Sequence, residues 1–136
     1  MAPSPRALLV EDALRAGHRV QIHAAGSSMR PLIPSGARLT VEPTTLPQIR
    51  RGDVVVALDA GQLVAHRVTD LSPLELRGDS ATGVERAPDL LGRVVAVEWR
   101  GFTYRIDSGW GRLWSLACAR LGPWVRRGEA ALRATR

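Results

Sequence analysis

The sequence predicts a mainly β domain with a helix at its N-terminal end and an amphipathic helical tail. Three observations support this fold class. Six or seven short segments alternate apolar with polar residues or are continuously apolar, which is typical of strands. Glycines punctuate the intervals between these segments. Only the two ends of the chain show helical spacing instead.

The first helix is expected over residues 5–16. Ser4 and Pro5 fit an N-cap followed by proline in the first turn, and Gly17 is a stop signal. From residue 19 the period changes to two. Strands are expected near residues 20–24, 39–41, 53–59, 63–70, 74–77, 94–99 and 102–107, with a hairpin turn at 60–62.

The helical period returns at Gly109, so we divide the chain into a domain (1–108) and a basic, Trp-rich tail (109–136). Gly122-Pro123 should interrupt the tail and separate two helices. Two interpretations of residues 110–136 stay open: the tail lies on an anionic membrane surface, or it packs on the domain or binds a partner protein. The apolar positions at helical spacing are Trp110, Leu113, Trp114, Ala117 and Leu121.

Composition limits the function classes. The chain has 136 residues and one cysteine, which predicts one domain without an intramolecular disulfide. We expect no cofactor and no metal. The net charge of +6 fits a GC-rich genome that favours arginine, and we expect no specific nucleic-acid partner. No apolar run is long enough for a secretory signal or a membrane span, so we expect a cytoplasmic location, with peripheral membrane contact as an open alternative.

Residues 26–31, Gly-Ser-Ser-Met-Arg-Pro, set Ser28 in a turn between glycine and proline. A serine hydroxyl becomes a useful nucleophile only when a neighbouring base takes its proton. All 19 basic residues are arginine and none is lysine, which excludes a serine–lysine dyad. If Ser28 is a nucleophile, its base should be His18, His23 or His66.

Strand geometry separates these three histidines. His66 shares a strand face with Val64 and Val68, so it should point into an apolar wall, an environment that favours the neutral ring a general base requires. His23 falls on the opposite face of its strand from the apolar residues, and His18 sits at a helix end. Both are expected at the surface.

Four signals occur in order along the chain. They are Ser28-Met29-Arg30-Pro31, Arg51-Gly52-Asp53 before an apolar strand, His66-Arg67-Val68 and Gly78-Asp79. In this order and spacing they resemble the signal-peptidase and repressor-peptidase superfamily, over about residues 18–100. The first matches the nucleophile motif of that superfamily and the last matches its late Gly-Asp box. The third matches the general-base box of the endoplasmic-reticulum and archaeal branch, where histidine replaces the lysine of bacterial signal peptidases.

This resemblance implies a complex of small antiparallel sheets and a serine endopeptidase, in a short form without a membrane anchor. Ser28 would be the nucleophile and His66 the general base, and the substrate would be an extended peptide or protein cut after a small residue. The leader of a small precursor peptide is our guess for that substrate.

The resemblance also implies a third, acidic group that orients the imidazole. Asp79 is the first choice, and Glu85 and Asp89 are alternatives because the branch also uses an acid a few positions after the late box. For the oxyanion we expect the backbone N–H of Ser28. Substrate-binding residues are expected at Gly26, Ser27, Met29 and Pro31.

Two other classes of function compete with this one. A non-catalytic, peptidase-like module could bind a partner protein, a membrane or RNA, although the intact serine and histidine boxes argue against it. A self-cleaving repressor relative is disfavoured because about 18 residues before the β region are too few for a DNA-binding domain. The Ala25–Gly26 bond also lies too near Ser28 in the chain to reach it.

Overall fold

The computed structural model describes residues 3–134, and the side chains of residues 3–128. Eight strands form one antiparallel sheet in the order β1-β2-β7-β3-β4-β5-β6, with β8 paired to β7 outside this path. The elements are α1 (Pro5–Arg15), β1 (Val20–His23), β2 (Arg38–Pro43), the short 3-10 helix η1 (Leu46–Gln48), β3 (Val54–Asp59), β4 (Gln62–Leu71), β5 (Leu74–Arg77), β6 (Val84–Arg86), β7 (Asp89–Trp99), β8 (Phe102–Arg105) and α2 (Gly109–Ala134). The predicted mainly β class with a helix at each end is confirmed.

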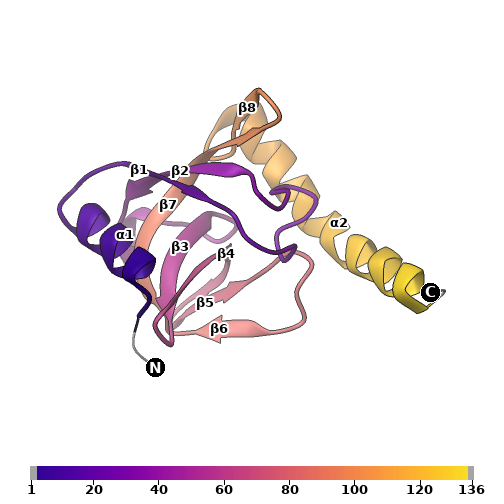
Figure 1. Ribbon diagram of the computed structural model, residues 1–136, viewed down its shortest axis with the longest axis horizontal. Helices are drawn as coiled ribbons and strands as arrows, with labels where there is room; N and C mark the ends of the chain where they lie inside the picture. Colours follow the sequence, from indigo (N-terminus) through magenta and orange to yellow (C-terminus); the bar gives the residue numbers. More distant parts are fainter. Residues whose placement is uncertain (1–2, 135–136) are drawn as a thin grey trace.

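The N-terminal helix begins and ends where its sequence signals stand. The side chain of Ser4 accepts a hydrogen bond from the Ala7 N–H at 3.1 Å, and Pro5 occupies the first turn. After the helix, Gly17 takes a φ of +89°, which glycine adopts without strain. The helix contacts β1, β2 and β7, and Figure 1 shows it at the opposite side of the molecule from α2. Its buried residues are Ala7, Val10 and Leu14.

Strand β3 is the centre of the fold because both of its faces are buried. Val54 and Val56 belong to the core cluster that includes α1, and Val55 and Ala57 belong to a second cluster with β4 and β5. Its neighbours are β4 on one side and β7 on the other. A continuous apolar run is what a strand buried on both faces requires. This strand therefore gives β4, its hairpin partner, a rigid support.

The structure has more strand than the sequence predicts, in two places. Strand β7 begins at Asp89 rather than near residue 94, and β6 was not expected at all. The three residues of β6 are mostly exposed and pair only with β5. Such a short edge strand lacks the alternation over four or more residues that identifies strands in a sequence.

The expected break at Gly122-Pro123 is wrong, because α2 continues through Pro123 as one helix. Proline in a helix removes one backbone hydrogen bond, but contacts on both sides of it hold the two halves in line. Gly122 lies against the Asp79 backbone, and the Arg126 guanidinium donates to the Ala81 carbonyl at 3.1 Å. Residues 135–136 of the expected tail lie outside the described residues. Over the described part of the chain, no helix is both long and apolar enough to cross a membrane.

The helix packs on the domain through a face of small residues. Ser115 and Cys118 are buried, and two glycines on the same face lie against backbone atoms. A Cβ built on Gly111 would lie 1.7 Å from the Arg105 carbonyl oxygen, and one on Gly122 would lie 1.9 Å from that of Asp79. Packing on the domain, one of the two interpretations of the tail, therefore occurs through a face other than its large apolar stripe.

We predict that Gly122→Ala lifts α2 from the domain, because the new Cβ collides with backbone atoms rather than with a flexible side chain. Cys118 should then react with the thiol reagent DTNB in native buffer, whereas in the unaltered protein it should react only in denaturant. Burial raises the pKa of the Cys118 thiol, and the Asp79 carboxylate raises it further, so the reactive thiolate is scarce while the helix is docked.

Gly128→Ala is the matched control, since a Cβ there meets nothing within 4 Å. It should leave Cys118 protected and stabilise the helix by no more than about 1 kcal/mol. Continued protection of Cys118 in Gly122→Ala would contradict this docking of α2.

Candidate functional site

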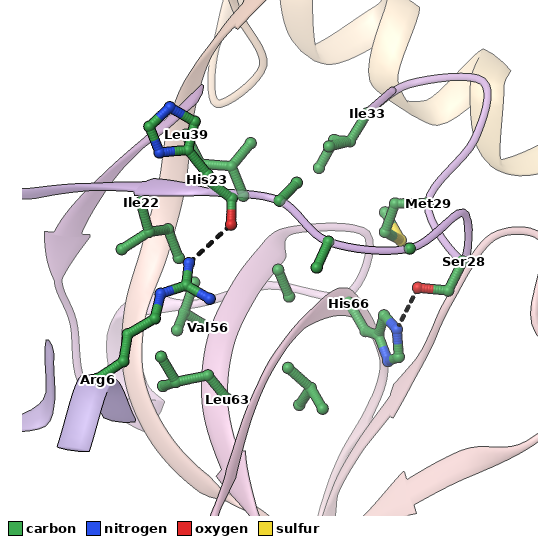
Figure 2. A pocket seen from close by; sticks show the side chains of 15 residues that line it. Arg6, Ile22, His23, Ser28, Met29, Ile33, Leu39, Val56, Leu63 and His66 are labelled. Carbon is green, nitrogen blue, oxygen red and sulfur yellow. Dashed lines mark hydrogen bonds between the residues drawn. The ribbon is translucent and has the colours of Figure 1, made fainter. Parts of the chain in front are cut away.

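Ser28 and His66 lie in contact although 38 positions separate them in the chain. Ser28 lies in the loop between β1 and β2, and His66 lies on β4, opposite Val55 of β3. The Ser28 Oγ is 2.8 Å from the His66 Nε2 (Figure 2). This is hydrogen-bond distance for a hydroxyl donating to a neutral ring nitrogen. The contact expected between these two residues is present.

The second ring nitrogen of His66 contacts Glu85 and not Asp79. His66 Nδ1 is hydrogen-bonded to Glu85 Oε1 on β6, and each of the two side chains is 13% exposed. A carboxylate at Nδ1 holds the proton on that nitrogen, which leaves Nε2 free to accept one from Ser28. The first choice for the orienting acid, Asp79, is therefore wrong, and the alternative Glu85 occupies the position. Asp89, the other alternative, is exposed at the start of β7.

Asp79 forms a buried ion pair with Arg67, the residue after His66. Successive residues of a strand point to opposite faces, so Arg67 faces α2 while His66 faces Ser28. All five guanidinium N–H groups donate: two to the Asp79 carboxylate at 2.7 and 2.8 Å, one to the Gly52 carbonyl, and two to the side chain and carbonyl of Ser115 on α2. Breaking such a pair by removing one partner costs about 3–5 kcal/mol.

The loop that carries Asp79 packs against the backbone of Ser28 and the side chain of Met29. The Ser80 N–H donates to the Ser28 carbonyl at 2.9 Å, and the Asp79 N–H donates to the Met29 sulfur at 3.4 Å. Gly78 packs so closely that an added Cβ would lie 2.7 Å from the Ser28 carbonyl oxygen. The late box, Gly78-Asp79, thus fixes the position of the Ser28 backbone and does not orient the ring of His66.

The backbone N–H of Ser28 is available to an incoming group. Over residues 3–134 it donates no hydrogen bond, while the carbonyl of the same residue is held by Ser80. A backbone N–H of the nucleophile that has no internal acceptor can donate to a developing oxyanion. The absence of an internal acceptor is compatible with the role expected of this group.

A cavity of about 200 Å³ opens beside the Ser28–His66 pair. Residues 22–26 form one wall and residues 63–66 of β4 form the other (Figure 2). A more open hollow of about 570 Å³ continues along β1 toward α1. Between the two walls the cavity is lined by the buried apolar side chains of Met29, Ile33, Leu39 and Val56.

Of the four residues expected to bind substrate, two line this cavity. Gly26 and Met29 do so, whereas Ser27 and Pro31 do not. Gly26 has a φ of +79° with open space around it, so a peptide can approach its backbone closely. The carbonyl of Ser27 instead accepts a hydrogen bond from the Ser80 hydroxyl.

The other two histidines lie at the surface, as expected. His18 is exposed after α1, and His23 is exposed at the end of β1, where its carbonyl accepts a hydrogen bond from the Arg6 guanidinium at 2.7 Å. Within residues 3–134, no three His, Cys, Asp or Glu side chains are grouped so that they could hold a metal ion.

Arg67 is the residue whose role the sequence analysis missed. In the sequence it stands out only as a member of the box around His66. A signal for its role was present, because a strand that places His66 on one buried face must place the next residue on the other. A buried arginine needs a carboxylate partner, and the acid of the Gly-Asp box was available.

No family model and no curated protein matched this chain in the comparisons that were made. The functional conclusion therefore depends on the geometry of the site.

We predict that Gly78→Ala displaces the Ser28 loop, because the new Cβ would overlap the Ser28 backbone. Overpacking of this kind costs about 1–3 kcal/mol, and the melting temperature should fall together with the reactivity of Ser28. Gly83→Ala, in the same loop region but with nothing within 4 Å of its Cβ, should change neither. Equal behaviour of the two variants in thermal unfolding and in labelling by a serine-directed phosphonate would contradict the support of Ser28 by this loop.

Proposed function

We propose that the protein is a serine endopeptidase of the signal-peptidase type, with Ser28 as nucleophile, His66 as general base and Glu85 as the orienting acid. The observation that carries the proposal is the contact of both ring nitrogens of His66, one with the Ser28 hydroxyl and one with the Glu85 carboxylate. Ser28 and His66 also line a cavity, which a purely structural hydrogen bond would not require.

The proposed reaction follows from this arrangement. His66 Nε2 takes the proton of Ser28 as Oγ attacks the scissile carbonyl, and the Ser28 N–H stabilises the oxyanion. The imidazolium, held by Glu85, then gives the proton to the leaving amine, and an acyl-enzyme remains. Water, deprotonated by the same ring, attacks the ester and restores the Ser28 hydroxyl as the acid product leaves.

The walls of the cavity support an extended peptide as substrate. Over residues 3–134, no hydrogen bond uses the backbone groups of Ala25 and Gly26. On the facing side, β5 begins to pair with β4 only at Arg67, so residues 63–66 keep one unpaired edge. Two free edges that face one cavity suit a peptide that adds as a strand between them. The small volume, lined by Ala24 and Ala65, favours a small residue beside the scissile bond.

The motifs around Ser28 and His66 support the histidine branch of the signal-peptidase superfamily, and a contact of Glu85 with the base agrees with an acid a few positions after the late box. We propose cytoplasmic action on the leader of a small precursor peptide. A precursor encoded by a neighbouring gene, and cut by the purified protein, would support this substrate.

We predict that Ser28→Ala and His66→Ala each lower the kcat/KM for a cleaved peptide by at least about a thousandfold. A peptide library with alanine or glycine at the scissile position supplies the substrate. A fluorophosphonate should label Ser28 in the unaltered protein and fail to label Ser28→Ala. A folded protein that neither labels nor cleaves would favour a non-catalytic binding module, and undiminished turnover in either variant would refute the pair.

We predict that Glu85→Gln lowers kcat by about 10²–10⁴-fold, since an amide no longer stabilises the imidazolium. Asp89→Asn is the matched control because Asp89 is an exposed acid in the same region of sequence, and it should retain full activity. The same loss in both variants, or in neither, would contradict the assignment of Glu85. Thermal unfolding of each variant separates a catalytic loss from a loss of fold.

A further inference from the structure

The face of α2 that points away from the domain is a stripe of large apolar side chains. Their positions are separated by one, three or seven residues, a spacing that places them along one side of a helix. Each is between 46% and 87% exposed, and three of the five are tryptophan. We call this face the Trp stripe; its members are Trp110, Leu113, Trp114, Leu121 and Trp124.

The charge beside the Trp stripe is of one sign. Residues 109–128 contain four arginines and no acidic residue. Arg112 and Arg126 bind the domain, by donating hydrogen bonds to the Asp53 carboxylate and the Ala81 carbonyl. Arg120 and Arg127 lie two turns apart on one border of the stripe, and the Arg127 guanidinium is 5.4 Å from the centre of the Trp124 ring.

We propose that the Trp stripe binds α2 to the surface of an anionic lipid bilayer, with the helix lying in the plane of the interface. Tryptophan suits this position because its ring is apolar and its N–H reaches the wet headgroup region. The two bordering arginines attract anionic headgroups. An amphipathic helix with a basic border and aromatic apolar residues is the usual form of such an anchor.

The charge argues against a second copy of the chain as the occupant. Two copies that met through this face would bring Arg120 and Arg127 near the same residues of the partner. Residues 109–128 contain no acidic side chain that could offset that repulsion, and like charges opposed in an interface disfavour association. Anionic headgroups would instead attract Arg120 and Arg127.

Binding through the stripe leaves the domain contacts of α2 intact. The helix docks on the domain through Gly111, Ser115, Cys118 and Gly122, a face separate from the Trp stripe. The helix can therefore bind a bilayer while Ser115 stays bonded to Arg67. This inference does not depend on the proposed function, and Ser28→Ala should bind vesicles as the unaltered protein does.

The test is co-sedimentation of the full chain with vesicles of phosphatidylcholine, alone or mixed with phosphatidylglycerol. We expect binding to the mixed vesicles that weakens as salt screens the arginines. Trp110→Ser with Trp124→Ser should weaken it by about tenfold or more. Arg120→Gln with Arg127→Gln should weaken it by about fivefold for each charge removed.

Leu46→Ser is the matched control, because Leu46 on η1 is as exposed as Leu121 but lies outside the stripe. It should not change vesicle binding, and Cys118 should stay protected from DTNB in every variant. Absence of vesicle binding, equal binding to both lipid mixtures, or full binding by the tryptophan variant would each overturn the proposal. Self-association that the tryptophan substitutions abolish, without vesicle binding, would assign the stripe to a second copy instead.

Discussion

The buried ion pair between Arg67 and Asp79 is the interaction on which the rest of the structure depends. Its guanidinium joins three parts of the chain that are remote in sequence: the turn at Gly52, the loop at Asp79 and the helix α2 at Ser115. Because the pair is almost fully buried, neither charge can be left without the other. The loop that it fixes is the one that holds the Ser28 backbone. The position of the candidate nucleophile is thus set by an arginine that never contacts it.

Strand β4 explains how one segment serves both the site and the scaffold. Its alternation sends His66 toward Ser28 and Glu85, and Arg67 toward Asp79 and α2. A shift of β4 by one residue would exchange these two side chains and destroy both networks. Pairing with the doubly buried β3 resists such a shift. The turns at Gly52-Asp53 and Gly78-Asp79 both hold α2 on the domain. Asp53 of the first binds Arg112, and Asp79 of the second lies against Gly122.

Much of this could be predicted because the relevant signals are local. Capping at Ser4, the apolar run of β3 and the alternation around His66 depend on neighbours in sequence, and the absence of lysine left only histidine as a base. The identity of the orienting acid could not be predicted, because Glu85 reaches His66 only through the register of β6 on β5. Asp79 was the nearer acid in sequence, but Arg67 competes for it. The two interpretations of the tail stayed open for a related reason: apolar spacing identifies a stripe but not its partner, and the face that packs on the domain consists of small residues.

The central claim is that Glu85 holds the Nδ1 proton of His66 while Nε2 faces Ser28. A strong hydrogen bond of this kind moves the ring proton far downfield in the proton NMR spectrum, where few other signals occur. We expect one such resonance in the unaltered protein, still present in Asp89→Asn, displaced upfield in Glu85→Gln and lost in His66→Ala. A folded protein without this resonance, or one whose resonance is the same in Glu85→Gln, would contradict the account.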